Sequence, residues 1–177
     1  TGALLVRRGV KVITDRPGGG HERGIRSGTP DVAGACALAT ALEYAAAHRL
    51  ERVQRAEELR RRLLAGLPND VRLTVDPRAA SAAIIHLMIP THHPEAVLLA
   101  MDMAGVDVSA GSACHAGVSR PSRIVMELGY GENQALGVLR VSTGIETQAA
   151  DIDAFLSALP AAIRAGQALD EREGTVA

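Results

Sequence analysis

The chain of 177 residues is long enough to bury a core, and one or two domains are expected at this length. Its 47% hydrophobic and 22% charged residues are typical of a globular protein and exclude a disordered one. A net charge of -1 and few aromatic residues (one Phe, two Tyr, no Trp) argue against a surface that binds nucleic acid directly.

No apolar stretch of the sequence approaches the roughly 20 residues that cross a bilayer. No signal peptide is visible, and two cysteines are too few for a disulfide framework. We therefore expect a cytoplasmic protein without a membrane segment.

The beginning of the chain predicts two short strands, over residues 3–6 and 10–13. A ribbon of two short strands is marginal alone, so these residues are expected to belong to a larger sheet. Because the sequence starts at Thr1 inside the first of these strands and without Met, we interpret the chain as a fragment. Lys11 is the only lysine, so chemistry that needs a lysine amine must use Lys11 or a lysine outside this chain.

A glycine-rich segment, residues 17–31, ends in the signals of a helix start. Thr29 is a good N-cap, Pro30 suits the first helical position, and Asp31 complements the helix dipole. Together with the arginines of this segment, such a helix start fits a phosphate-binding site. It fits an ordinary capped helix with solvated arginines equally well.

Residues 32–67 predict a long helical run, with a break near His48 because the run exceeds the usual length of one globular helix. Cys36 lies in this run among alanines and is interpreted as a small buried hydrophobe. The arginines of the second half alternate with glutamates, which predicts a solvated face.

Strands and helices alternate from residue 68 onward, as in a small α/β unit. The expected strands are 71–75, 82–89, 106–109 and 138–142, and the expected helices are 94–104, 121–128 and 147–165. Thr91 is expected to open the first of these helices and Thr147 to cap the last, which should kink at Pro160. The polar tail over 170–177 is expected to fray.

Cys114 lies just past the expected strand 106–109, in a run of small residues. A cysteine that only fills a core normally stands among large apolar residues on a regular element. A loop of small residues instead lets the sulfur move and be reached, which a nucleophile needs. The adjacent His115 could help to form the thiolate, although adjacency alone does not orient it. A free cysteine without a role is the alternative interpretation.

Arg140 stands in the expected strand 138–142 and faces the opposite way from Leu139 and Val141. If it is buried, its guanidinium must meet an anion, because an unpaired buried charge is costly. That anion is either a structural carboxylate or the carboxylate of a ligand held by two hydrogen bonds. The six histidines show no metal-ligand spacing, so no metal site is expected.

Three motifs occur in the order G-G-G-H-E-R-G-I-R-S-G-T-P, S-A-G-S-A-C-H-A-G-V-S-R-P-S and L-R-V-S-T-G. In this order and spacing they closely resemble the C-terminal half of the NifS/IscS-type cysteine desulfurases. These enzymes belong to the class V aminotransferase superfamily, with fold type I and pyridoxal phosphate as cofactor. The resemblance covers residues 1 to about 165. The small-residue loop around Cys114 resembles the family group with a long cysteine loop, and His115 stands where members often have Thr.

The resemblance implies an α/β fold in three parts. Residues 1–31 would be the end of the large cofactor domain and 32–67 a connecting helix. Residues 68–177 would form the complete small domain, with a mainly antiparallel sheet, helices and the cysteine loop. The lysine that binds pyridoxal 5'-phosphate would lie outside this chain, upstream of Thr1.

The resemblance also implies site residues and partners. Cys114 would accept sulfur from L-cysteine as a persulfide and leave L-alanine, Arg140 would bind the substrate carboxylate, and Thr29 would reach the cofactor phosphate of the neighbouring subunit in a homodimer. A sulfur-acceptor or scaffold protein, as in iron–sulfur cluster assembly, would take the sulfur. Selenocysteine lyase or another class V enzyme, and a non-catalytic small domain that binds partners, are the alternatives. The final destination of the sulfur is open among iron–sulfur clusters, thiolated tRNA and DNA phosphorothioation.

Overall fold

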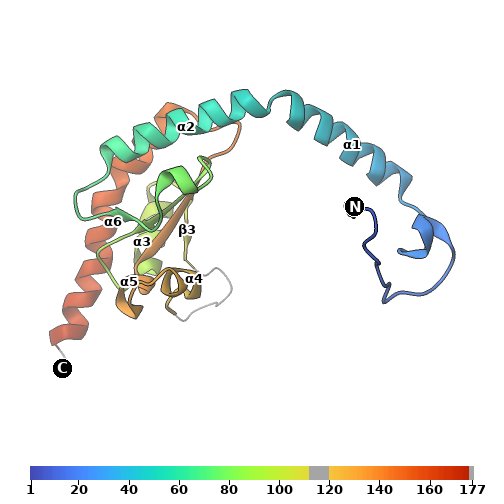
Figure 1. Cartoon of the computed structure of the whole chain (residues 1–177). Coiled ribbons are helices and arrows are strands. Elements are labelled where there is room, and N and C mark those ends of the chain that lie inside the picture. The colour runs from blue at the N-terminus through green and yellow to red at the C-terminus, as the bar shows by residue number, and fades with distance from the viewer. Residues whose placement is uncertain (112–119, 176–177) are drawn as a thin grey trace. The chain divides into compact units, whose positions relative to one another are not determined.

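A computed structural model describes residues 1–111 and 120–175 of the chain (Figure 1). The chain divides into two compact units, Thr1–Leu50 and the part that begins at Glu51. The second unit combines helices with one antiparallel sheet, which confirms the predicted α/β class.

The first unit contains a short 3-10 helix, η1 (His21–Gly24), and the helix α1 (Val32–Ala47). The two strands predicted at residues 3–6 and 10–13 are absent, so that prediction is wrong. A strand is stable only beside another strand, and the described part of the chain offers these residues no partner.

The start of α1 also differs from the prediction. Asp31, and not Thr29, is the N-cap, because its carboxylate accepts a hydrogen bond from the Gly34 amide at 2.9 Å. The Thr1 hydroxyl donates to the same carboxylate at 2.6 Å. These two hydrogen bonds are the largest influences on the pKa of Asp31 and lower it, ahead of burial and of nearby positive charges.

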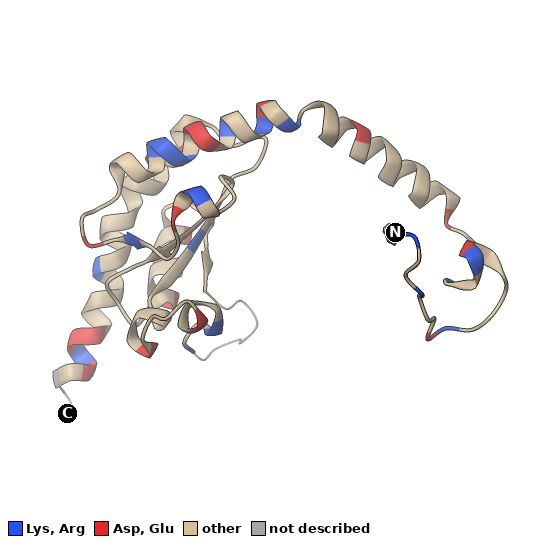
Figure 2. Cartoon of the chain, viewed as in Figure 1, with Lys and Arg blue, Asp and Glu red and all other residues tan. Residues whose placement is uncertain are grey.

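The predicted break at His48 is confirmed, since α1 ends at Ala47 and α2 (Arg49–Gly66) begins directly after it. Cys36 contradicts its prediction, because its side chain is exposed. The reason is that no residue of α1 is buried, so its alanine-rich composition does not make it a core helix. Along α2, acidic and basic residues alternate on the surface, as predicted (Figure 2).

Four strands make the sheet of the second unit, in the order β1-β2-β4-β3 and with every neighbouring pair antiparallel. The strands are β1 (Arg72–Leu73), β2 (Ile84–Met88), β3 (Ser109–Ala110) and β4 (Val138–Ser142). The central pair is β2 and β4, which match over five residues each, whereas β1 and β3 are short edge strands.

One face of this sheet carries the main core. The strands contribute alternate apolar residues, as expected for a sheet with one buried face, and the helices α2, α3 (Pro94–Met103) and α6 (Ala149–Thr175) pack on them. The largest fully buried side chains of this core are Leu59, Leu63, Ile85, Leu87, Val97, Met101, Leu139, Phe155 and Leu159.

A smaller cluster covers only one end of the other face. Val138 of β4 packs there with Val125 of α4 (Arg123–Glu127) and Ala135 of α5 (Glu132–Leu136). The helix α5 was not predicted, because five residues are too few to show a helical period. The rest of this face lies beyond this cluster, and it includes Arg140.

The last helix runs further than predicted. It begins at Ala149 instead of 147, because the Thr147 hydroxyl accepts a hydrogen bond from the Gly144 amide and does not cap the helix. It continues through Pro160 and past residue 165 to Thr175, so the predicted frayed tail is helical in its described part.

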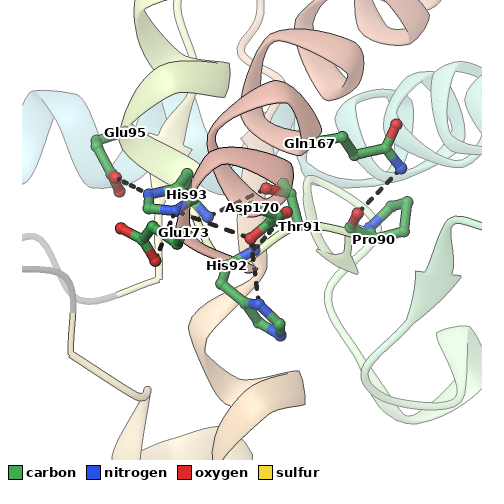
Figure 3. Close-up of polar contacts among 8 residues, drawn as sticks. All are labelled: Pro90, Thr91, His92, His93, Glu95, Gln167, Asp170 and Glu173. Carbon is green, nitrogen blue, oxygen red and sulfur yellow. Dashed lines mark hydrogen bonds and ion pairs between the residues drawn. The ribbon is translucent and has the colours of Figure 1, made fainter. Parts of the chain in front are cut away.

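Polar contacts explain why the end of α6 is ordered (Figure 3). Gln167 donates to the Pro90 carbonyl at 3.1 Å, and Asp170 accepts from the His92 amide at 3.1 Å. His93 lies beside three carboxylates: its Nδ1 is 3.0 Å from Glu95, and its Nε2 is 3.4 Å from Glu173 and 3.8 Å from Asp170. The imidazole therefore links the first turn of α3 to the last turns of α6.

The charges around His93 decide its protonation. Burial, the largest single cause, lowers its pKa, but the hydrogen bond to Glu95 and the charges of Glu173, Glu95 and Asp170 together raise it above the ordinary value. A raised pKa means that the folded state binds the proton more tightly than the unfolded state does. The stabilisation by His93 is therefore complete below the unfolded histidine pKa, which is about 6.5, and is lost as the pH rises through the folded pKa.

We predict that His93→Gln lowers the free energy of unfolding of the chain at pH 6 and has a smaller effect at pH 9. Urea unfolding of the two proteins across this pH range measures the difference. His21→Gln, which changes an exposed histidine of the other unit, is the matched control and should show no such pH dependence. A His93→Gln effect that is constant from pH 6 to pH 9 would contradict the ionic role of this side chain.

Candidate functional site

Arg140 lies in the middle of β4 and is half-buried. Its neighbours Leu139 and Val141 point into the main core, so the period of the strand places Arg140 on the opposite face, as predicted. Among the described residues, no carboxylate lies within ion-pair distance of its guanidinium. Arg140 is therefore available to an anion that comes from outside the described part of the chain.

A row of polar residues crosses the sheet from strand to strand at the position of Arg140. His86 of β2 and Ser109 of β3 stand directly opposite Arg140, one on each side. On the far side of His86, the Thr74 amide donates to the His86 carbonyl at 3.1 Å, and the Thr74 hydroxyl lies 3.1 Å from His86 Nδ1. We call these residues the polar row: Thr74, His86, Arg140 and Ser109.

From the sequence, no site role was predicted for His86, which was considered only as one of six histidines without metal-ligand spacing. The available signal was its position in Ile84–Met88, where it interrupts an apolar strand on the face away from the core. Burial and, second, the charge of Arg140 lower the pKa of His86. The imidazole is therefore kept uncharged beside the guanidinium at neutral pH.

The described residues on either side of the segment that carries Cys114 lie against Val138, two residues along β4 from this row. Cys114 itself lies outside the described residues. Gly111 is the last described residue before it, and a Cβ placed on Gly111 would collide with the Val138 side chain and lie 3.5 Å from the Ser122 Cβ. Ser122 in turn donates its amide to the Ala135 carbonyl at 2.8 Å. The two described flanks of the segment thus meet against Val138, two residues along β4 from Arg140.

Thr29, the third predicted site residue, is exposed and belongs to the first unit, so its position is described separately from Arg140. Its carbonyl accepts a hydrogen bond from Arg26 at 3.3 Å, and none of the described residues binds its hydroxyl. The helix start beyond it already holds an anion, the Asp31 carboxylate. These residues fit one hydroxyl contact to a phosphate, and not a complete phosphate site.

Other features of the described residues do not add a site. An open groove of about 540 Å³ lies between α2 and the start of α6, lined among others by Arg55, Glu58 and Arg62, and contains none of the predicted site residues. In the described ranges, no three His, Cys, Asp or Glu side chains are arranged to hold a metal ion. No helix there is both long and apolar enough to cross a membrane.

Comparisons with known proteins agree with one family. A family model described as aminotransferase class-V matches residues 13–155. An IscS-like cysteine desulfurase of Mycobacterium tuberculosis (strain ATCC 25618 / H37Rv) is 41% identical over 166 residues, which are 92% of this chain and 42% of that protein. The chain thus spans about two fifths of the length of such relatives.

Two solved structures have a similar fold. A NifS-like protein from Rickettsia africae matches with a TM-score of 0.74 and 22% identity, over 86% of this chain and 40% of that one. A second NifS-like protein matches with a TM-score of 0.72 and 25% identity, over 93% of this chain and 41% of that one. At 22% sequence identity, the similarity to the Rickettsia africae protein concerns the fold alone.

We predict that Gly111→Ala destabilises the second unit by about 1–3 kcal/mol, the usual cost of overpacking a tight contact, because the new methyl group meets the side chain of Val138. Gly144→Ala is the matched control, since a methyl group added there would meet no atom within 4 Å and the backbone is not left-handed. Urea unfolding measures both. Equal stability of the two variants would show that Gly111 does not approach Val138 as closely as described.

Proposed function

The chain belongs to the class-V aminotransferase family, and from this premise we propose that it forms the C-terminal part of a cysteine desulfurase that uses pyridoxal 5'-phosphate. The reaction would take sulfur from L-cysteine, release L-alanine and leave a persulfide on Cys114. The observation that carries the proposal is Arg140, a half-buried arginine without a carboxylate partner among the described residues. The similarity to cysteine desulfurases over nine tenths of the chain supports it.

Arg140 is proposed to bind the carboxylate of L-cysteine. A guanidinium presents parallel N–H donors that match the two oxygens of a carboxylate. Its place on a central strand supports this role, because five paired residues of β2 hold β4 in register and the core fixes the alternate side chains. A substrate bound in this way would be oriented by the most rigid part of the unit.

Cys114 is proposed to be the nucleophile. Its thiolate attacks the substrate sulfur, the carbon–sulfur bond breaks, and a new sulfur–sulfur bond forms on Cys114. The electron pair of the broken bond stays on the substrate carbon, which then takes up a proton to give alanine. The meeting of the flanks Gly111 and Ser122 near Arg140 supports this proposal, since the segment is anchored close to the proposed substrate carboxylate.

Pyridoxal 5'-phosphate, when bound, would supply the electron sink that weakens the carbon–sulfur bond. By resemblance, the lysine that binds it lies outside this chain. Lys11, the lysine of this chain, is exposed in a segment without a strand. That location supports the proposal that a different lysine binds the cofactor. Thr29 is proposed to give one hydroxyl contact to the phosphate of the partner subunit in a homodimer.

The resemblance to cysteine desulfurases also leads us to propose the partners of the reaction. A sulfur-acceptor or scaffold protein would receive the sulfur from Cys114, in the cytoplasm. Iron–sulfur cluster assembly is one destination consistent with this chemistry.

The proposal is tested by measuring L-alanine formed from L-cysteine by the intact protein with its cofactor. We expect Arg140→Ala to lower kcat/KM by roughly 30- to 900-fold, equivalent to about 2–4 kcal/mol for loss of one partner of a buried charge pair. Arg78→Ala is the matched control, because Arg78 is an exposed arginine whose ion pair with Asp76 is a surface contact. This control should keep the activity of the unchanged protein.

The outcomes separate the alternatives. No alanine from the intact protein would favour a non-catalytic small domain that binds partners. A preference for selenocysteine when both substrates compete would favour selenocysteine lyase. Alanine formation that is unaffected by Arg140→Ala would make Arg140 a structural residue and would remove it from the proposed site.

A further inference from the structure

The polar row places a histidine directly beside the proposed carboxylate-binding arginine. His86 and Arg140 are paired residues of the antiparallel strands β2 and β4, so both side chains leave the same face of the sheet. The Cβ atoms of such pairs are about 4.5–5.5 Å apart. The charge of Arg140 acts on the imidazole, so the charge of a small anion on the guanidinium would act on it as well.

The two nitrogens of His86 are in different situations. Nδ1 lies 3.1 Å from the Thr74 hydroxyl, and Thr74 is in turn buried and held by the Tyr130 hydroxyl, which donates to its carbonyl at 3.0 Å. Within the described residues, Nε2 has no hydrogen-bond partner. The ring is therefore fixed on one side and available on the other.

The charges around His86 come from few groups. Arg140 faces it from β4, and Thr74, which carries no charge, faces it from the end of β1. Arg72 of β1 stands in the next row, opposite Met88, and is exposed. No carboxylate of the described residues is in contact with the ring. The one strong field on the imidazole is thus the positive charge of Arg140, which together with burial lowers the pKa of His86.

An anion bound to Arg140 would weaken this field. Its negative charge would offset the guanidinium and would attract a protonated imidazole. We propose that His86 is a second determinant of carboxylate binding at Arg140, and that it takes up a proton from solvent when a small carboxylate such as that of an amino acid binds. The inference rests on the proposed role of Arg140 and adds a residue to that site.

Linkage fixes the direction of the effect. If binding raises proton uptake by His86, then lower pH must tighten binding by the same factor. The effect is confined to the pH range between the free and the bound pKa of this one histidine. Above that range His86 is neutral in both states and carboxylate affinity no longer depends on it.

The test uses propionate as the probe, because it carries a carboxylate and no amine or thiol that titrates. Its inhibition constant against L-cysteine is measured with the intact, cofactor-loaded protein between pH 6 and pH 8.5. We expect this constant to rise by about 3- to 10-fold from low to high pH, since a shift of one pKa unit corresponds to a tenfold change. His86→Gln should abolish this rise, while His48→Gln, at the helix break, should keep it.

A second readout does not depend on turnover. NMR titration of the histidine ring signals, with His86 assigned through its own backbone resonances, should show a higher pKa of His86 when propionate is saturating. This measurement is made on the unchanged protein, so it holds even if the variant fails to fold.

The two proposals fail in different ways. If Arg140→Ala leaves the propionate constant unchanged, or propionate does not inhibit, Arg140 is not the carboxylate site and the inference falls with it. If Arg140→Ala abolishes propionate binding but His86 titrates identically with and without propionate, only the role of His86 is overturned. A wild-type pH dependence retained in His86→Gln overturns it as well.

Discussion

The pairing of β2 with β4 is the constraint on which the second unit depends. Five residues of each strand match in antiparallel register, and this register assigns every side chain to one of two faces. Leu87 and Leu139 thereby meet in the main core, while His86 and Arg140 meet on the opposite face. A slip of one residue would exchange the two faces and bury the arginine against the helices. The apolar core and the candidate site are thus fixed by the same hydrogen bonds.

Two histidines show how position determines protonation in this fold. His93, among three carboxylates, has a raised pKa and holds the end of α6 through its charge. His86, half-buried beside a guanidinium, has a lowered pKa. The first favours the charged ring and has a structural role, whereas the second favours the neutral ring in a place where an arriving anion would change the balance. The fact that both residues are histidines predicts neither the raised nor the lowered pKa.

Local pattern predicted the elements with a clear period. The strands β2 and β4, the helix α3 and the break at His48 follow from apolar spacing and helix length, and the side of β4 taken by Arg140 follows from alternation. The length of α6 could not be predicted, because its last turns are held by His92 and His93, residues far away in the sequence.

The parts of the site that depend on strand pairing also could not be predicted from the sequence. The neighbours of Arg140 become known only when the register of β2 and β4 is known, and His86 is 54 positions away in the sequence. The N-cap of α1 differs from the prediction for a related reason: Thr29 and Asp31 are both good N-caps, and the hydrogen bonds from Gly34 and Thr1 select Asp31. The assignments of Cys114 and Thr29 come from motifs and remain predictions.

The most direct test of the account is the location of the persulfide in the intact protein. After one turnover with L-cysteine, the persulfide is alkylated and the modified peptide is identified by mass spectrometry. Because the cysteine in α1 is exposed, it can react with the same reagents and serves as an internal comparison. We predict the persulfide on Cys114, and a persulfide found only on Cys36 would contradict the proposed role of Cys114.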